Sequence, residues 1–131
     1  MIKYSIEIIL LIIIIIMAIL GDKFKFYQLF KWWDLLSHFI AGITFAKIGY
    51  VFTENLLVAF MFAITLQTMW EIYEFLNDEY FGTNMQRRYY TINMPDSRIK
   101  SAAIRDTMTD TISYSLGAVL MIIIILIYMY H

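Results

Sequence analysis

The chain contains no cysteine and only one proline among its 131 residues. Without cysteine it can form no disulfide, no thiolate metal site and no cysteine nucleophile, and the redox state of its compartment leaves no mark on the sequence. Charged residues are also scarce, at 16% of the chain, and the formal net charge is −1. This near-neutral balance gives no indication of a nucleic-acid partner, and we expect none.

Apolar residues are abundant instead, at 61% of the sequence, and the mean hydropathy is +0.67. Four long apolar stretches predict membrane-spanning helices at about residues 4–20, 35–52, 56–76 and 108–130. Each is close to the roughly 20 residues that a helix needs to cross a bilayer core. β-Branched residues are frequent, but backbone groups in lipid must be satisfied within the segment, which favours helices. The sequence therefore predicts an all-α integral membrane protein, a four-transmembrane-helix bundle forming a single domain over residues 1–131.

The first apolar stretch has one alternative interpretation, a signal peptide with Lys3 as its charged start. No convincing small-residue cleavage site follows Ala18. An uncleaved helix is therefore the favoured prediction.

The basic residues are grouped in two connecting segments that lie on one side of a four-span protein. The linker, residues 21–33, carries three lysines between aromatic residues, as segments at the lipid headgroups do. The long loop, residues 77–105, carries five basic residues. The positive-inside rule then predicts that both segments are cytoplasmic and that both termini lie outside. We expect a multi-pass protein of the plasma (inner) membrane.

Seven polar or ionisable side chains fall on matching faces of three predicted helices, at one membrane depth. They are Asp34 and His38 on the second span, Gln67, Glu71 and Glu74 on the third, and Asp106 and Asp110 on the fourth. Residues three or four apart share a helix face, and all three stripes fall in the cytoplasmic leaflet. A charged group in hydrocarbon costs roughly 2.5–3.5 kcal/mol even on the mildest scale, so this cluster is expected to bind something. Small residues nearby, such as Gly42 and Gly117, would let these helices approach closely.

Carboxylates gathered this closely repel one another, and some would have to take up protons unless a partner is present. A bound metal, shared protons or ion pairs with nearby arginines would each relieve the repulsion. Several oxygen donors and one imidazole suit a divalent ion such as Mg²⁺, Mn²⁺ or Zn²⁺. A ferritin-like di-iron site is disfavoured because the chain has no Glu-x-x-His motif. The predicted metal ligands are Asp34, His38, Glu71, Asp106 and Asp110.

Other residues have predicted roles around this set. Glu74 is the predicted general base, and Gln67 and Ser37 are expected to support the ligands. Simpler interpretations stay open for individual residues: a core position for His38, and a first-turn carboxylate for Asp106. The residues predicted to bind a headgroup phosphate are Arg87, Arg88 and Arg105, although topology alone would also place basic residues there.

Three motifs resemble the YjdF-like family of small bacterial inner-membrane proteins. They are Trp-Asp-x-x-x-His-Phe-x-x-Gly at residues 33–42, Glu-x-x-Glu at 71–74 and Asp-Thr-x-x-Asp at 106–110, followed by Gly117. The resemblance covers about residues 33–120 and implies a helical fold in the membrane, without an established activity. A looser likeness is to VanZ-like membrane proteins, but the Glu-x-x-Gln element of that group has no clear match here.

Three functions are compatible with the predicted cluster. The favoured one is a metal-dependent membrane hydrolase or transferase acting on a lipid or lipid-linked headgroup, since the acids lie at headgroup depth near arginines. The second is a cation- or proton-binding transport protein, and the third is a structural or accessory protein whose polar network fixes helix pairing. Membrane lipid is the expected partner. Catalysis itself and oligomerisation stay open at this point.

Overall fold

A computed structural model of the chain describes residues 5–83, 85 and 96–130, with side chains described from residue 103 onward in the last segment. This part of the chain is helical and contains no strand. Its helices are α1 (Ser5–Lys23), α2 (Phe26–Leu29), α3 (Lys31–Thr53), α4 (Leu56–Phe81) and α5 (Asp96–Tyr130). All but the short α2 are long and apolar enough to cross a membrane. The prediction of an all-α membrane bundle with four spans is confirmed.

The helices extend beyond the predicted spans. α3 begins at Lys31 instead of near residue 35, and α4 continues to Phe81 instead of ending near residue 76. α5 begins at Asp96, so both ends of the predicted loop 77–105 are helical. Hydropathy marks only the apolar middle of a helix, whereas backbone hydrogen bonds continue through its polar ends. α4 stops at Gly82, which adopts the left-handed conformation (φ 63°) that favours glycine.

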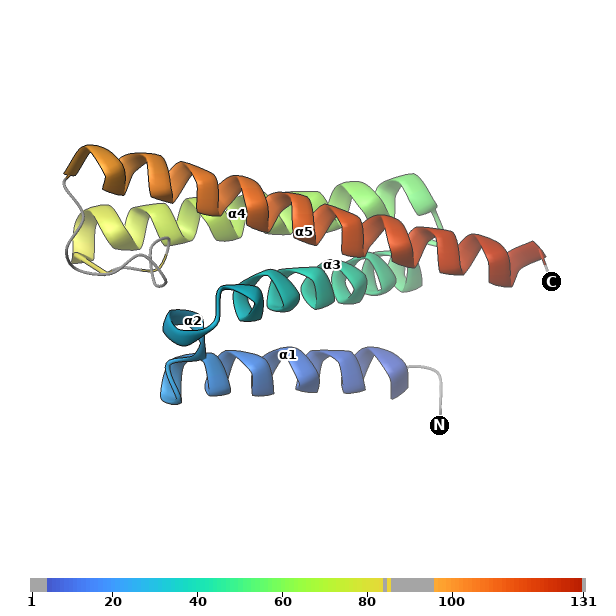
Figure 1. Ribbon diagram of the computed structural model, residues 1–131. Coiled ribbons are helices and arrows are strands. Elements are labelled where there is room, and N and C mark those ends of the chain that lie inside the picture. The colour runs from blue at the N-terminus through green and yellow to red at the C-terminus, as the bar shows by residue number, and fades with distance from the viewer. Residues whose placement is uncertain (1–4, 84, 86–95, 131) are drawn as a thin grey trace.

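α3 is the central helix of the described structure. It packs most extensively against α5, and it also contacts α4 and α1. In Figure 1, α3 lies between α1 on one side and the α4–α5 pair on the other. Within the described residues, α1 contacts only α2 and α3, and its backbone does not closely approach α4 or α5. The bundle is therefore a three-helix unit of α3, α4 and α5 with α1 attached to one face.

α3 and α5 pack closely because glycines on each helix face the backbone of the other. A Cβ atom on Gly42 would collide with the carbonyl oxygen of Tyr114, and one on Gly117 would collide with that of Phe39. Ser113 adds a hydrogen bond across the same interface, since its hydroxyl donates to the carbonyl of Leu35 at 2.7 Å. The predicted close approach at Gly42 and Gly117 is confirmed, and it fixes the distance between the polar residues of the two helices.

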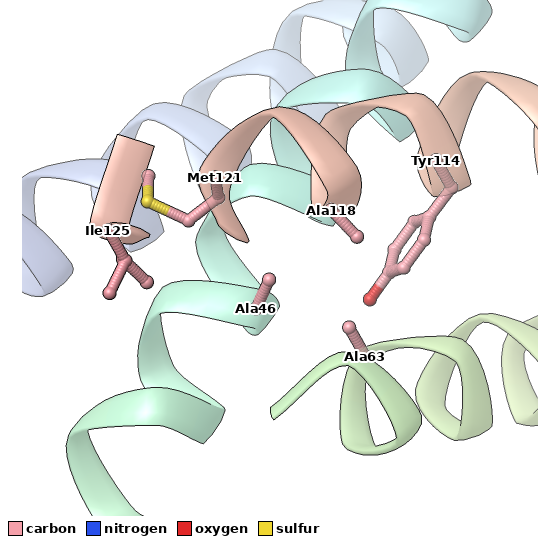
Figure 2. Close-up of a cluster of buried hydrophobic side chains, with 6 residues drawn as sticks. All are labelled: Ala46, Ala63, Tyr114, Ala118, Met121 and Ile125. Carbon is pink, nitrogen blue, oxygen red and sulfur yellow. The ribbon is translucent and has the colours of Figure 1, made fainter. Parts of the chain in front are cut away.

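The buried apolar core lies further along α3 and α5 than the polar cluster. Figure 2 shows its side chains meeting between α3, α4 and α5: Ala46, Ala63, Tyr114, Ala118, Met121 and Ile125. Many large apolar side chains of these helices point outward, such as Leu57 (70% exposed) and Ile127 (56% exposed). This outward apolar surface suits contact with lipid tails, which are as apolar as leucine itself.

Candidate metal centre

Three of the predicted ligands meet at the interface of α3 and α5. Asp34 and His38 are one turn apart on α3, and Asp110 faces them from α5. His38 Nε2 lies 3.6 Å from Asp34 Oδ1 and 3.8 Å from Asp110 Oδ2. One ligand atom from each residue lies within 4.8 Å of the others. His38 and Asp110 are buried, with 8% and 2% of their surface exposed, so this group is held inside the bundle.

A hydrogen-bonded chain from α4 fixes how the His38 ring is oriented. His38 Nδ1 lies 3.2 Å from Gln67 Oε1, and Gln67 Nε2 donates to Glu71 Oε1 at 2.6 Å. Because the Gln67 amide donates its N–H to Glu71, it presents its oxygen to His38. His38 then donates from Nδ1, and its Nε2 faces the two aspartates. Metal-binding histidines carry the same arrangement, with one nitrogen donating to an outer partner and the other free to ligate.

Two buried carboxylate oxygens in this part of the bundle accept no hydrogen bond within the described structure. Glu71 Oε2 and Asp110 Oδ1 have no hydrogen-bond partner among the described residues. Buried acceptors are nearly always satisfied in folded proteins, and each exception needs an explanation. Asp110 belongs to the group with Asp34 and His38, whereas Glu71 lines another crevice, between α4 and α5. Asp34, His38 and Asp110 have the spacing to hold a metal ion.

Asp106 and Glu74 lie beside this group but not within it. Asp106 is one turn before Asp110 and lines a small cavity together with Lys31, Asp34 and Asp110. Glu74 is buried and accepts a hydrogen bond from the indole N–H of Trp70 at 2.9 Å. Among the described residues, only Asp34, His38 and Asp110 form a group with metal-ligand spacing, so Glu71 and Asp106 stay predictions as ligands.

Ser37 and three arginines are the remaining residues of the predicted site. The Ser37 hydroxyl donates to the Trp33 carbonyl at 2.8 Å, so it stabilises α3 itself. Arg105 is exposed on α5. Arg87 and Arg88 lie outside the described residues, and their predicted contact with a headgroup stays a prediction.

Two buried polar features were not assigned a role from the sequence. Tyr114 is 2% exposed, and its hydroxyl has no hydrogen-bond partner within the described structure. Glu7 of α1 is 8% exposed and pairs with Lys47 of α3 at 3.8 Å. In the sequence, Glu7 and Lys47 each stand alone as a charged residue within an apolar stretch, and opposite charges placed in this way indicate an ion pair between helices. The pair explains how α1 attaches to α3 near the N-terminus of the chain.

The chain belongs to a family of predicted membrane proteins, DUF2238, whose profile matches residues 2–131. This family is consistent with the resemblance to YjdF-like proteins. No curated protein and no solved structure matches the chain significantly. The family supports the membrane location, and the chemistry has to be argued from the side chains.

Proposed function

We propose that this protein binds a divalent metal ion through Asp34, His38 and Asp110 and uses it as a membrane hydrolase or transferase on a lipid headgroup. One observation carries the proposal. Nε2 of a buried histidine lies 3.6 and 3.8 Å from oxygens of two carboxylates, and one ligand atom from each residue lies within 4.8 Å of the others, which is the spacing of a metal site.

The donor set indicates which ion would bind. Two carboxylates with one imidazole suit Zn²⁺ or Mn²⁺, and carboxylates alone would also accept Mg²⁺. Three protein ligands are the usual number in catalytic zinc sites, which keep a further position for water or substrate. Glu71, linked to His38 through Gln67, and Asp106, beside Asp110, are the proposed additional oxygen donors.

The surroundings of the three ligands suit headgroup chemistry. A bound metal would polarise a phosphoryl or ester oxygen or activate a water molecule. Glu74 is the proposed general base, and it lines the same crevice as Asp34 and His38. Trp70 holds the Glu74 carboxylate by donating to its Oε1, and this carboxylate is the group proposed to take up a proton. Arg105, with Arg87 and Arg88, is proposed to attract the phosphate of the headgroup.

A structural role is the second candidate, and one observation favours it. The chain His38–Gln67–Glu71 links α3 to α4, and the bond from Ser113 to Leu35 links α5 to α3, so the polar residues also fix helix pairing. A transport function has less support. Beyond the cluster, the described interior between α3, α4 and α5 is mainly the apolar core, and the buried Thr44 hydroxyl there donates to the Ile40 carbonyl of its own helix, which leaves no continuous row of polar groups for ions among the described residues.

We further propose that the chain is a YjdF-like protein of the plasma (inner) membrane, with the cluster in the cytoplasmic leaflet and both termini outside. The grouping of basic residues in the linker and the long loop supports this orientation.

Metal analysis of the purified full chain tests the proposed function. We expect a stoichiometric divalent ion in the wild-type protein and its loss in Asp110→Asn and His38→Gln. Asp78→Asn is the matched control, because Asp78 is not part of the group with metal-ligand spacing and its Oδ1 accepts from the Thr83 hydroxyl and the Met85 amide at the end of α4. A wild-type protein without bound metal after purification in Zn²⁺- or Mn²⁺-containing buffer would overturn the proposal.

A further inference from the structure

A crevice of about 310 Å³ adjoins the candidate metal centre. Its volume falls within the roughly 300–1,000 Å³ of typical small-molecule sites. α1 and α4 provide its opposite walls and α3 its floor, and within the described residues the backbones of α1 and α4 do not closely approach each other. Figure 1 shows α1 set apart from α4 on the far side of α3. The crevice therefore lies at the side of the bundle that α1 covers loosely.

The crevice changes from polar to apolar along its length. Asp34, His38 and Glu74 line one end, which is the end next to the metal ligands. Since α1 and α4 run opposite to α3, positions further from that end are earlier in α1 and α4 and later in α3. The lining there is apolar, formed by Ile14, Ala18, Ala41, Phe45 and Leu66. A ligand that fills this space has a polar group at one end and a hydrocarbon body.

Tyr114 provides an independent indication of a bound molecule. It lies one turn beyond Asp110 on α5 and lines the same crevice. The residue is 2% exposed, and its hydroxyl has no partner in the described part of the chain. In Figure 2 the hydroxyl points away from α5 toward α4. A hydroxyl buried in an apolar environment without a partner costs about 1–3 kcal/mol, which a hydrogen bond to a ligand oxygen would remove.

We propose that this crevice binds one acyl chain of a membrane glycerolipid, with the headgroup at Asp34, His38 and Asp110 and a lipid oxygen accepting from Tyr114. The substrate of the enzyme is then a lipid held by its tail, not a soluble phosphate ester. This substrate assignment rests on the proposed function, whereas binding of the chain rests on the crevice itself.

The test measures lipid and metal on the same samples. The full chain is purified in detergent, stripped of lipid, and incubated with phosphatidylglycerol or, separately, with glycerol 3-phosphate. Native mass spectrometry then counts bound lipid, and elemental analysis counts bound metal. We expect the wild-type protein to retain phosphatidylglycerol after washing and to show no comparable binding of glycerol 3-phosphate.

Two matched variants locate the site. Leu66→Trp fills the apolar end of the crevice, and we expect it to lower lipid retention at least tenfold while metal content stays unchanged. Leu116→Trp makes the same change at a lipid-facing position of α5 (59% exposed), and we expect it to behave as wild type. Tyr114→Phe removes only the hydroxyl and should weaken retention about two- to tenfold, as the loss of one hydrogen bond does.

The outcomes separate this inference from the proposed function. Equal lipid retention in Leu66→Trp and wild type would overturn the crevice assignment, as would glycerol 3-phosphate binding as tightly as the lipid. If wild type retains lipid, Leu66→Trp loses it and neither holds metal, the chain-binding crevice is supported and the metal-dependent activity fails.

Discussion

At the scale of single residues, Gln67 decides how the cluster is arranged. It accepts from His38 and donates to Glu71, and only 2% of its surface is exposed. It therefore sets which nitrogen of His38 faces the two aspartates. A residue that is not itself a proposed ligand thus orients a ligand for binding.

Replacing Gln67 with methionine keeps the length of the side chain and removes both hydrogen bonds. The buried Glu71 then loses the hydrogen bond from Gln67, so we expect the free energy of unfolding to fall by about 1–3 kcal/mol. The affinity for Zn²⁺ should also fall about 10- to 100-fold, since His38 loses the partner that orients its ring. Thermal unfolding in detergent and Zn²⁺ titration measure the two effects. Gln28→Met, at an exposed position of α2, is the control, and equal behaviour of the two variants would contradict the role of Gln67.

A substitution at Glu74 tests the proposed catalysis separately from metal binding. Glu74→Gln retains an oxygen to accept from Trp70 but cannot take up a proton as a carboxylate does. We expect metal content and lipid retention to stay unchanged, while turnover of phosphatidylglycerol falls by about 10²- to 10⁴-fold, the usual contribution of a general base. Glu79→Gln, exposed near the end of α4, should leave turnover unchanged. Loss of metal in Glu74→Gln would instead identify Glu74 as a ligand.

At the scale of helices, the distance between α3 and α5 sets the geometry of the candidate metal centre, because Asp110 reaches His38 across this interface. Gly42 and Gly117 hold the two backbones together, and each lies within one or two turns of a proposed ligand on its own helix. The packing of these glycines and the geometry of the cluster therefore depend on the same pair of helices.

The loss of stability on replacing each of three glycines with alanine should depend on the space available for the added Cβ atom. A Cβ on Gly42 or Gly117 would overlap a carbonyl of the facing helix, whereas on Gly49 its nearest neighbour, the Ala59 Cα, is at 3.0 Å. Overpacking typically costs about 1–3 kcal/mol, so Gly42→Ala and Gly117→Ala should lose at least that much stability and Gly49→Ala less. Unfolding in detergent ranks the three variants. A larger loss for Gly49→Ala than for the other two would contradict this account of the α3–α5 interface.

For the whole molecule, the sequence predicted what depends on helical periodicity and hydropathy. The all-α bundle follows from the length of the apolar stretches, and the shared faces of Asp34 with His38 and of Gln67 with Glu71 follow from their spacing. The bond between His38 and Gln67 and the unpaired hydroxyl of Tyr114 depend on how the helices are rotated against one another. That rotation is set by tertiary packing, here around Gly42 and Gly117, and a single helix does not encode it. The polar ends of α3, α4 and α5 were missed because hydropathy does not report helix beyond the membrane.

The orientation of the whole molecule decides which leaflet supplies the substrate. The chain is free of cysteine, so a single introduced thiol reports its own location without removal of native ones. Glu54→Cys, between α3 and α4, should react with a membrane-impermeant maleimide in intact cells, whereas Asp22→Cys, at the end of α1, should react only after permeabilisation. Three lysines in the linker and five basic residues in the long loop favour this arrangement. The reverse labelling pattern would place the cluster in the outer leaflet, and the lipid headgroup acted on would then come from that face of the membrane.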